Sequence, residues 1–141
     1  MIMKIIPAFL SLLLLVSSFP AHASDEAIES IQEYLDFAPY DAGIILPEQL
    51  TEEIFQEFLF IDTRDDEQFE AETIAGAMNI EWREVLSRID EIPEDQTVIL
   101  FCNTGTLSSQ ALLALRVAGR ENVLVLQTGF KGWLVDAAFK P

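Results

Sequence analysis

Cys102 is the side chain of this sequence that is best suited to nucleophilic chemistry. It directly follows the apolar segment 97–101 and precedes a pattern that is typical of a helix. The loop between them consists of small and turn-forming residues, Asn103, Thr104, Gly105 and Thr106. Backbone N–H groups of such a loop, together with the positive end of the following helix, can bind an anion. A sulfur atom in this place is stabilised as the thiolate, so we expect the pKa of Cys102 to be lowered.

Residues 1–23 have the three parts of a secretory signal peptide. A lysine stands near the start, an apolar stretch follows, and the segment ends in Ala21-His22-Ala23, which fits an A-x-A cleavage site. We therefore expect an exported protein whose mature chain begins at Ser24. The alternative is an uncleaved membrane anchor, but two prolines leave the apolar stretch short of the ~20 residues that a spanning helix needs.

The mature chain would contain a single cysteine and no histidine, because His22 is the only histidine of the sequence and Cys102 the only cysteine. This inventory excludes Cys–His proteases, zinc sites built from cysteine and histidine, and dithiol redox chemistry. The sequence implies no cofactor and no metal, although ligation by carboxylates alone stays open. A lone thiol in an oxidising compartment needs a reason to be retained. The alternative to a reactive role is a cysteine that serves as a small buried apolar residue.

Sulfur transfer is the chemistry that fits a thiolate without a histidine. A thiolate held by backbone amides can attack an electrophilic sulfur, carry it as a persulfide and pass it to an acceptor. Neither step needs a general base once the thiol is ionised. Acyl transfer normally requires a base and an acid to manage the proton, and the sequence offers no obvious partner for that role.

The charge of the chain restricts its partners. The formal net charge is −16, and the loss of Lys4 with the leader makes it −17. Such a field repels phosphate backbones and anionic lipid, so neither nucleic acid nor a membrane surface is an expected partner. We expect a small-molecule sulfur donor and a thiol acceptor, and the sequence indicates no particular protein partner.

Apolar segments that alternate with helical patterns predict one small α/β domain with a mainly parallel central sheet and helices on both of its faces. We divide the chain into the leader 1–23, an N-terminal helical extension 24–42 that packs on the domain, and the domain itself, 43–141. Strands are expected at 43–46, 58–61, 77–80, 97–101 and 123–126, and helical segments at 24–37, 47–53, 65–71, 81–89, 107–118 and 131–139.

Five short motifs occur in an order and spacing that resemble the rhodanese-like domain. They are Phe60-Ile61-Asp62-Thr63-Arg64, Glu67-Gln68-Phe69, Ala75-Gly76-Ala77-Met78-Asn79-Ile80, Phe101-Cys102-Asn103-Thr104-Gly105 and Gly129-Phe130-Lys131-Gly132-Trp133. The Cys-Asn-Thr-Gly loop further resembles small, single-domain periplasmic rhodaneses of the phage-shock type. The resemblance implies a thiosulfate-like donor, a Cys102 persulfide, a thiol or cyanide-type acceptor and a periplasmic location.

The residues after Cys102 also depart from the family. Many rhodanese loops carry a basic residue four or five positions after the cysteine, where this chain has Thr106 and Leu107. Because no cation in the loop offsets the negative charge, we predict weak activity on thiosulfate, and a steady-state efficiency typical of strong rhodaneses would contradict this.

The catalytically weak alternative is a sulfur carrier or a protein-binding module on the same fold. A phosphatase or arsenate reductase is disfavoured, since those enzymes need an arginine where Ser108 stands.

The substrate loop is expected to comprise residues 103–108, and Ser108 either caps the following helix or donates to the sulfur. The resemblance further implies that Asp62 braces the neighbouring loops and that Arg64 lines the site, although an ion pair that only holds the fold is an equal alternative. The family's histidine before Gly76 is absent, and Thr73 or a neighbour takes its place. We interpret Phe130 and Trp133 as core residues.

Overall fold

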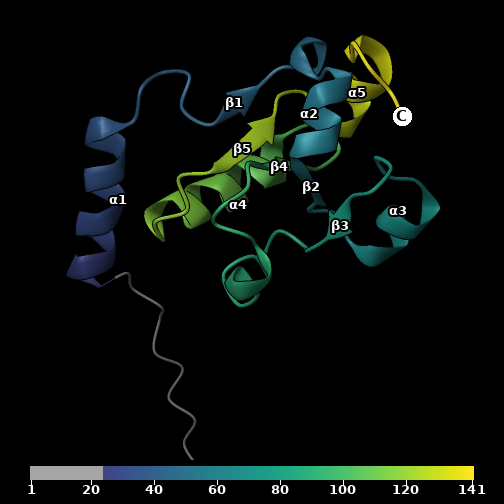
Figure 1. Cartoon of the computed structure of the whole chain (residues 1–141). Helices are drawn as coiled ribbons and strands as arrows, with labels where there is room; N and C mark the ends of the chain where they lie inside the picture. The colour runs from purple at the N-terminus through teal and green to yellow at the C-terminus, as the bar shows by residue number, and fades with distance from the viewer. Residues whose placement is uncertain (1–23) are drawn as a thin grey trace, which may run out of the picture.

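A computed structural model describes residues 24–141, and the expected signal peptide lies outside the described residues. The described part contains one parallel sheet with the strand order β1-β5-β4-β2-β3. Figure 1 shows the sheet with its helices. The strands are β1 (Ile44–Ile45), β2 (Leu59–Asp62), β3 (Met78–Asn79), β4 (Val98–Phe101) and β5 (Val123–Leu126). The helices are α1 (Asp25–Phe37), α2 (Glu52–Glu57), α3 (Asp66–Ala71), α4 (Thr106–Val117) and α5 (Gly129–Asp136), with 3₁₀ turns at Pro47–Gln49 and Ile89–Glu91.

Strand β4 is the centre of the core because both of its faces are covered. Val98 and Leu100 point into one apolar cluster, and Ile99 and Phe101 point into the other. All four side chains are fully buried. This explains the unbroken apolar run in the sequence, since a strand that is buried on both faces has no solvent-facing positions to alternate with.

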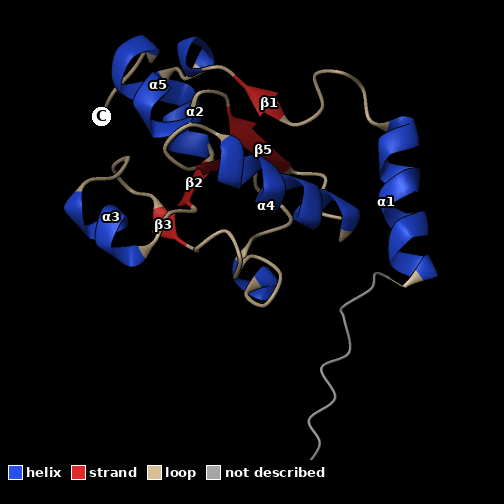
Figure 2. Ribbon diagram, turned by 180° about the vertical axis from the view of Figure 1, so that it is seen from behind, coloured by secondary structure: helices blue, strands red, loops and turns tan. Residues whose placement is uncertain are grey.

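The two clusters place helices on opposite sides of the sheet (Figure 2). Helix α4 covers one face with Ala111, Leu112 and Leu115. Helices α2 and α5 cover the other, where Phe130 and Trp133 are buried as expected. The prediction of a parallel sheet flanked by helices on both faces is therefore confirmed.

Residues that favour helix ends stand at the ends of several of the observed helices. Ser24 caps α1 by accepting the amide of Ala27 at 3.2 Å, and Asp65 caps α3 by accepting the amide of Gln68 at 2.9 Å. Gly119 follows α4 in the left-handed region, with φ of 93°. That conformation is the usual one for a glycine just after a helix, as the sequence predicts.

The prediction of a helix at 81–89 is wrong. Residues 82–88 form successive turns that lead into the 3₁₀ turn Ile89–Glu91. Ser87 donates its hydroxyl to the carbonyl of Glu84, a local bond that competes with helical pairing, and Arg88 has a non-helical backbone. The apolar side chains still pack on the core as a helix of that spacing would, because Val85 is buried and Trp82 and Ile89 lie against the same cluster.

A second difference concerns the segment after β1. The helical turn expected at 47–53 is divided into the 3₁₀ turn Pro47–Gln49 and helix α2, which continues to Glu57. The remaining expected elements occur with ends shifted by a few residues, as fraying ends commonly are.

The N-terminal helix α1 packs on the domain only in part. It contacts α4, yet none of its residues is buried, and Ile28 and Leu35 are each 56% exposed. Figure 1 shows it standing beside the layered domain and not within a layer. Among residues 24–141, no helix has the length and apolar character that a membrane crossing requires.

Candidate active site

Cys102 lies at the carboxyl edge of the sheet, directly after β4, and the loop 103–105 connects it to α4. The chain enters α4 through Gly105, which has φ of 90° and stands at the helix N-terminus. Ser108, one turn into the helix, is fully buried behind the sulfur and donates its Oγ to the Sγ of Cys102 at 3.6 Å. The same hydroxyl lies 3.1 Å from the carbonyl oxygen of Gly105. It has one proton for two acceptors, and a thiolate is the stronger acceptor of the two.

The pKa of Cys102 is lowered, as the sequence predicts. Burial raises the pKa, because it disfavours the charged thiolate. Hydrogen bonds from the amide and hydroxyl of Ser108, and from the amides of Thr104 and Leu107, outweigh burial and lower it. Three backbone N–H groups and one hydroxyl therefore hold the sulfur anion, in a site without an imidazole.

The start of α5 fixes the direction of the loop amides. The amide of Phe130 donates to the carbonyl of Cys102 at 2.7 Å, and the amide of Lys131 donates to the carbonyl of Asn103 at 3.1 Å. Because these carbonyls are turned toward α5, the N–H groups of the loop are left free to face the sulfur. Gly129 allows this close approach, with φ of 60° in the left-handed region.

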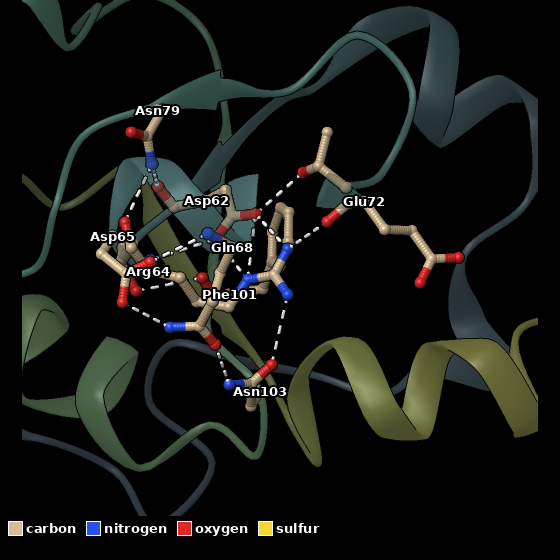
Figure 3. A network of polar contacts seen from close by, with 10 residues as sticks. Asp62, Arg64, Asp65, Gln68, Glu72, Asn79, Phe101 and Asn103 are labelled. Atoms are coloured by element: carbon tan, nitrogen blue, oxygen red, sulfur yellow. Dashed lines mark hydrogen bonds and ion pairs between the residues drawn. The ribbon is translucent and has the colours of Figure 1, made fainter. Parts of the chain in front are cut away.

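A buried ion pair supports the loop from the side of β2. Asp62 is fully buried at the end of β2, and Arg64 is 6% exposed, with Nη2 of Arg64 2.6 Å from Oδ2 of Asp62. Arg64 also donates Nη2 to the carbonyl of Glu72 at 2.6 Å and Nη1 to Oδ1 of Asn103 at 3.2 Å. Figure 3 shows Arg64 lying between Asp62 and Asn103. Arg64 thus connects the end of β2 to the loop that carries the cysteine.

Further side chains complete this support. Thr73 donates its hydroxyl to Oδ2 of Asp62 at 2.8 Å. Asn79 donates to the carbonyls of Asp62 and Arg64, and Asn103 donates to Gln68 at 2.6 Å. The carboxylate of Asp62 receives its hydrogen bonds from Arg64 and Thr73, as a buried charge requires.

Cys102 is only 2% exposed, but it lines a cavity of about 450 Å³ at the edge of the sheet. Of the expected loop residues, Asn103, Thr104 and Leu107 also line this cavity, as does Arg64. Gly105 and Thr106 instead line a separate hollow of about 450 Å³ beside β5, which Thr104 also borders. Cys102 therefore borders the first cavity, and the loop contacts its sulfur mainly through backbone groups.

Comparison with known proteins agrees with this architecture. A family described as "Rhodanese-like domain" matches residues 46–136. The chain belongs to the rhodanese-like domain family. A curated "Sulfurtransferase" of Allochromatium vinosum is 30% identical over 78 residues, which cover 55% of this chain and 73% of that protein. The Bacillus subtilis "Uncharacterized protein YqhL" is 36% identical over 88 residues, covering 60% of this chain and 70% of that protein.

Other relatives of this rhodanese-like domain are longer. The matched segment spans 19% of the "Probable adenylyltransferase/sulfurtransferase MoeZ" of Mycobacterium tuberculosis, with 35% identity over 75 residues. The crystal structure of a rhodanese-related protein from Thermoplasma volcanium superposes with a TM-score of 0.59 at 22% identity, covering 64% of this chain and 88% of that one. Family membership and the names of these relatives support sulfur transfer as the general chemistry of the domain.

Sequence reasoning missed three residues of the rhodanese-like site. Glu81, Trp82 and Arg83 follow β3 and line the same cavity as Cys102. The expectation of a helix from residue 81 onward gave no reason to place them there. A signal was available, because the carboxyl ends of parallel strands meet at one edge of a sheet and these residues directly follow such an end.

We predict that Ser108→Ala raises the pKa of Cys102. The substitution removes the hydroxyl that donates to the sulfur but keeps the backbone amide of the same residue. The thiolate fraction near pH 7 falls, so alkylation of Cys102 by iodoacetamide becomes slower and its pH profile moves to higher pH. Thr106→Ala is a matched control, because its hydroxyl interacts with Thr104 and not with the sulfur. An unchanged alkylation profile in Ser108→Ala would contradict a role of this hydroxyl.

Proposed function

We propose that the protein is an exported sulfurtransferase that moves a sulfane sulfur from a thiosulfate-like donor to a thiol or cyanide-type acceptor. The observation that carries the proposal is Cys102, which lines a cavity and whose sulfur receives hydrogen bonds that outweigh the effect of burial on its pKa. The lowered pKa increases the fraction of Cys102 that is present as the nucleophilic thiolate, beside a cavity of a size that suits a small molecule. The family and the relative named as a sulfurtransferase support the same chemistry.

The reaction proceeds in two displacements. The Cys102 thiolate attacks the outer sulfur of thiosulfate, the S–S bond of the donor breaks, and its electron pair leaves with sulfite. The product is an anionic persulfide on Cys102. A cyanide or thiolate acceptor then attacks the terminal sulfur and regenerates the Cys102 thiolate, so neither step requires proton transfer by a base.

The amides around Cys102 stabilise negative charge in both enzyme forms. They hold the thiolate before the first step, and they face the region where charge returns in the second. Asp62 and Arg64 act indirectly, by holding Asn103 and therefore the loop. The donor enters through the cavity that Thr104 and Leu107 border.

The proposed location rests on the leader, which supports export, and on the family resemblance, which supports the periplasm. Residues 1–23 have the pattern of a cleaved signal peptide. The loop resembles those of small periplasmic rhodaneses of the phage-shock type, so we assign the mature protein to the periplasm. N-terminal sequencing of the protein recovered from an expression host tests the assignment. A mature chain that begins at Ser24 supports it, and a chain that keeps residues 1–23 contradicts it.

Intact-mass measurement of the mature protein tests the chemistry. After incubation with thiosulfate the mass is expected to rise by one sulfur atom, and addition of cyanide or a dithiol is expected to return it to the starting value with release of the transferred sulfur. An adduct that persists in the presence of every acceptor would indicate a sulfur carrier. Absence of an adduct with thiosulfate and with polysulfide would contradict the proposal.

A docking or carrier module is a second candidate, and helix α1 favours it. The helix carries five acidic residues, no basic residue and an apolar stripe that the domain leaves largely uncovered. Exposed apolar side chains at helical spacing are typical of a surface that a protein partner covers. If α1 serves docking alone, Leu35→Ser leaves turnover of small donors unchanged and weakens only transfer to a protein acceptor.

A further inference from the structure

The cavity beside Cys102 is lined by two arginines that differ in their availability. Arg64 is 6% exposed, and its guanidinium is engaged by the carboxylate of Asp62, the carbonyl of Glu72 and the side chain of Asn103. A guanidinium has five N–H groups in a fixed plane, and these three partners take up most of them. Most N–H groups of Arg64 are therefore occupied by contacts that hold the fold.

Arg83, in contrast, has N–H groups that are available for a ligand. Its side chain is 72% exposed and forms an ion pair with Glu81 through Nε alone, at 3.0 Å and 3.1 Å from the two carboxylate oxygens. Within residues 24–141, its terminal nitrogens Nη1 and Nη2 make no hydrogen bond. Four N–H groups of this cation thus have no partner among the described residues, and Arg83 lines the cavity that Cys102 also lines.

Trp82 lies next to this cation. The Cζ atom of Arg83 is 6.0 Å from the centre of the Trp82 ring, and both side chains line the cavity. An arginine over an aromatic face is held by a cation–π attraction, which leaves its N–H edge free for an oxyanion. Sulfonate and sulfite oxygens suit this edge, because arginine binds two oxygens of an oxyanion such as phosphate with two parallel hydrogen bonds.

We propose that Arg83 binds the anionic end of the sulfur donor and sets the preference of the site for anionic over neutral donors. The inference rests on the proposed sulfur transfer and names the residue that replaces the missing cation of the loop. When thiosulfate enters, its sulfonate oxygens contact Nη1 and Nη2 of Arg83 while the outer sulfur meets Cys102. Sulfite then leaves with the electron pair of the broken S–S bond and remains beside the same guanidinium until it diffuses away.

Glu81 limits the strength of this contact. Its carboxylate shares the guanidinium of Arg83, and Asp65 adds a second negative charge to the lining of the cavity. The attraction for a dianion is therefore partly cancelled. This accounts for a site that accepts anionic donors but binds them weakly, in agreement with the low thiosulfate activity that the sequence predicts.

The test compares Arg83→Gln with the unaltered protein on two donors, thiosulfate and the neutral diallyl trisulfide. We expect kcat/KM for thiosulfate to fall about 10-fold, mainly through KM, because the variant lacks the charged N–H groups that contact the sulfonate oxygens. Turnover of diallyl trisulfide is expected to fall much less, because this donor carries no charge for Arg83 to bind. Glu81→Gln is expected to lower the KM for thiosulfate, since it removes the competing carboxylate. Lys140→Gln is the matched control for net charge, as Lys140 does not line the cavity.

A second measurement separates the role of Arg83 from the proposed activity. Sulfate resembles thiosulfate but cannot donate sulfur, so at constant ionic strength it is expected to slow alkylation of Cys102 by iodoacetamide in the unaltered protein and not in Arg83→Gln. Protection by sulfate in both proteins, or equal losses with both donors, overturns the assignment of Arg83. Protection that depends on Arg83, in a protein that transfers sulfur from neither donor, supports the anion contact and overturns only the proposed function.

Discussion

Cys102→Ser is expected to reduce sulfur transfer to the rate measured without protein. A serine hydroxyl in this site stays protonated near neutral pH, so the amides of Thr104, Leu107 and Ser108 have no anion to stabilise. A protonated oxygen is a poor nucleophile toward sulfur and cannot form a persulfide. Because Cys102 is the only cysteine of the chain, no second thiol can replace it.

The fold is expected to survive this substitution. Serine differs from cysteine by one atom, and the hydroxyl of Ser108 lies beside the position that the new oxygen would take. The loss of a small buried apolar group is expected to cost on the order of 1 kcal/mol, which thermal unfolding can measure. Mass spectrometry after incubation with thiosulfate is expected to show no adduct. Turnover or an adduct in folded Cys102→Ser would show that another group carries the sulfur.

The strand and loop around Cys102 could be predicted because their signals are local. The apolar run of β4 predicts a strand that is buried on both faces, and the small residues after it predict a loop with inward N–H groups. The resemblance of five ordered motifs added Asp62 and Arg64. The structure places all of these at one edge of the sheet, with the lowered pKa of Cys102 that the loop pattern indicates.

The rest of the site depends on contacts between distant parts of the chain. The position of Arg83 follows from the turns after β3, and no periodicity predicts that the backbone leaves the helical path there. The bonds from α5 to the carbonyls of Cys102 and Asn103 join residues that are far apart in the sequence. The contacts of Arg64 with Glu72, just after α3, and with Asn103 in the loop are of the same kind, since they form only when these segments pack together.

Gly129→Ala is expected to lower the free energy of unfolding more than the addition of a methyl group at any other glycine of this site. A Cβ at Gly129 would overlap the carbonyl oxygen of Cys102 and lie 2.7 Å from the nitrogen of Thr104 and 2.8 Å from the carbonyl carbon of Asn103. All three are backbone atoms, which cannot move aside without moving the loop. The residue also has φ of 60°, which costs a residue with a Cβ about 1–2 kcal/mol. Overpacking adds about 1–3 kcal/mol, so we expect a total loss of about 2–5 kcal/mol in the free energy of unfolding.

The same substitution tests whether α5 orients the active-site amides. Moving Gly129 away from the loop breaks the bonds from Phe130 and Lys131 to the carbonyls of Cys102 and Asn103, so the loop amides lose their direction toward the sulfur. At a temperature where Gly129→Ala is still folded, alkylation of Cys102 is therefore expected to shift to higher pH and sulfur transfer to fall. Gly76→Ala is the matched control, because Gly76 also has a positive φ, of 81°, but no atom lies within 4 Å of its added Cβ. It should lose only the about 1–2 kcal/mol of the backbone term and keep the reactivity of the thiol. Equal losses of stability in the two variants, with an unchanged thiol in both, would show that the close approach of α5 to the loop is not what organises the site.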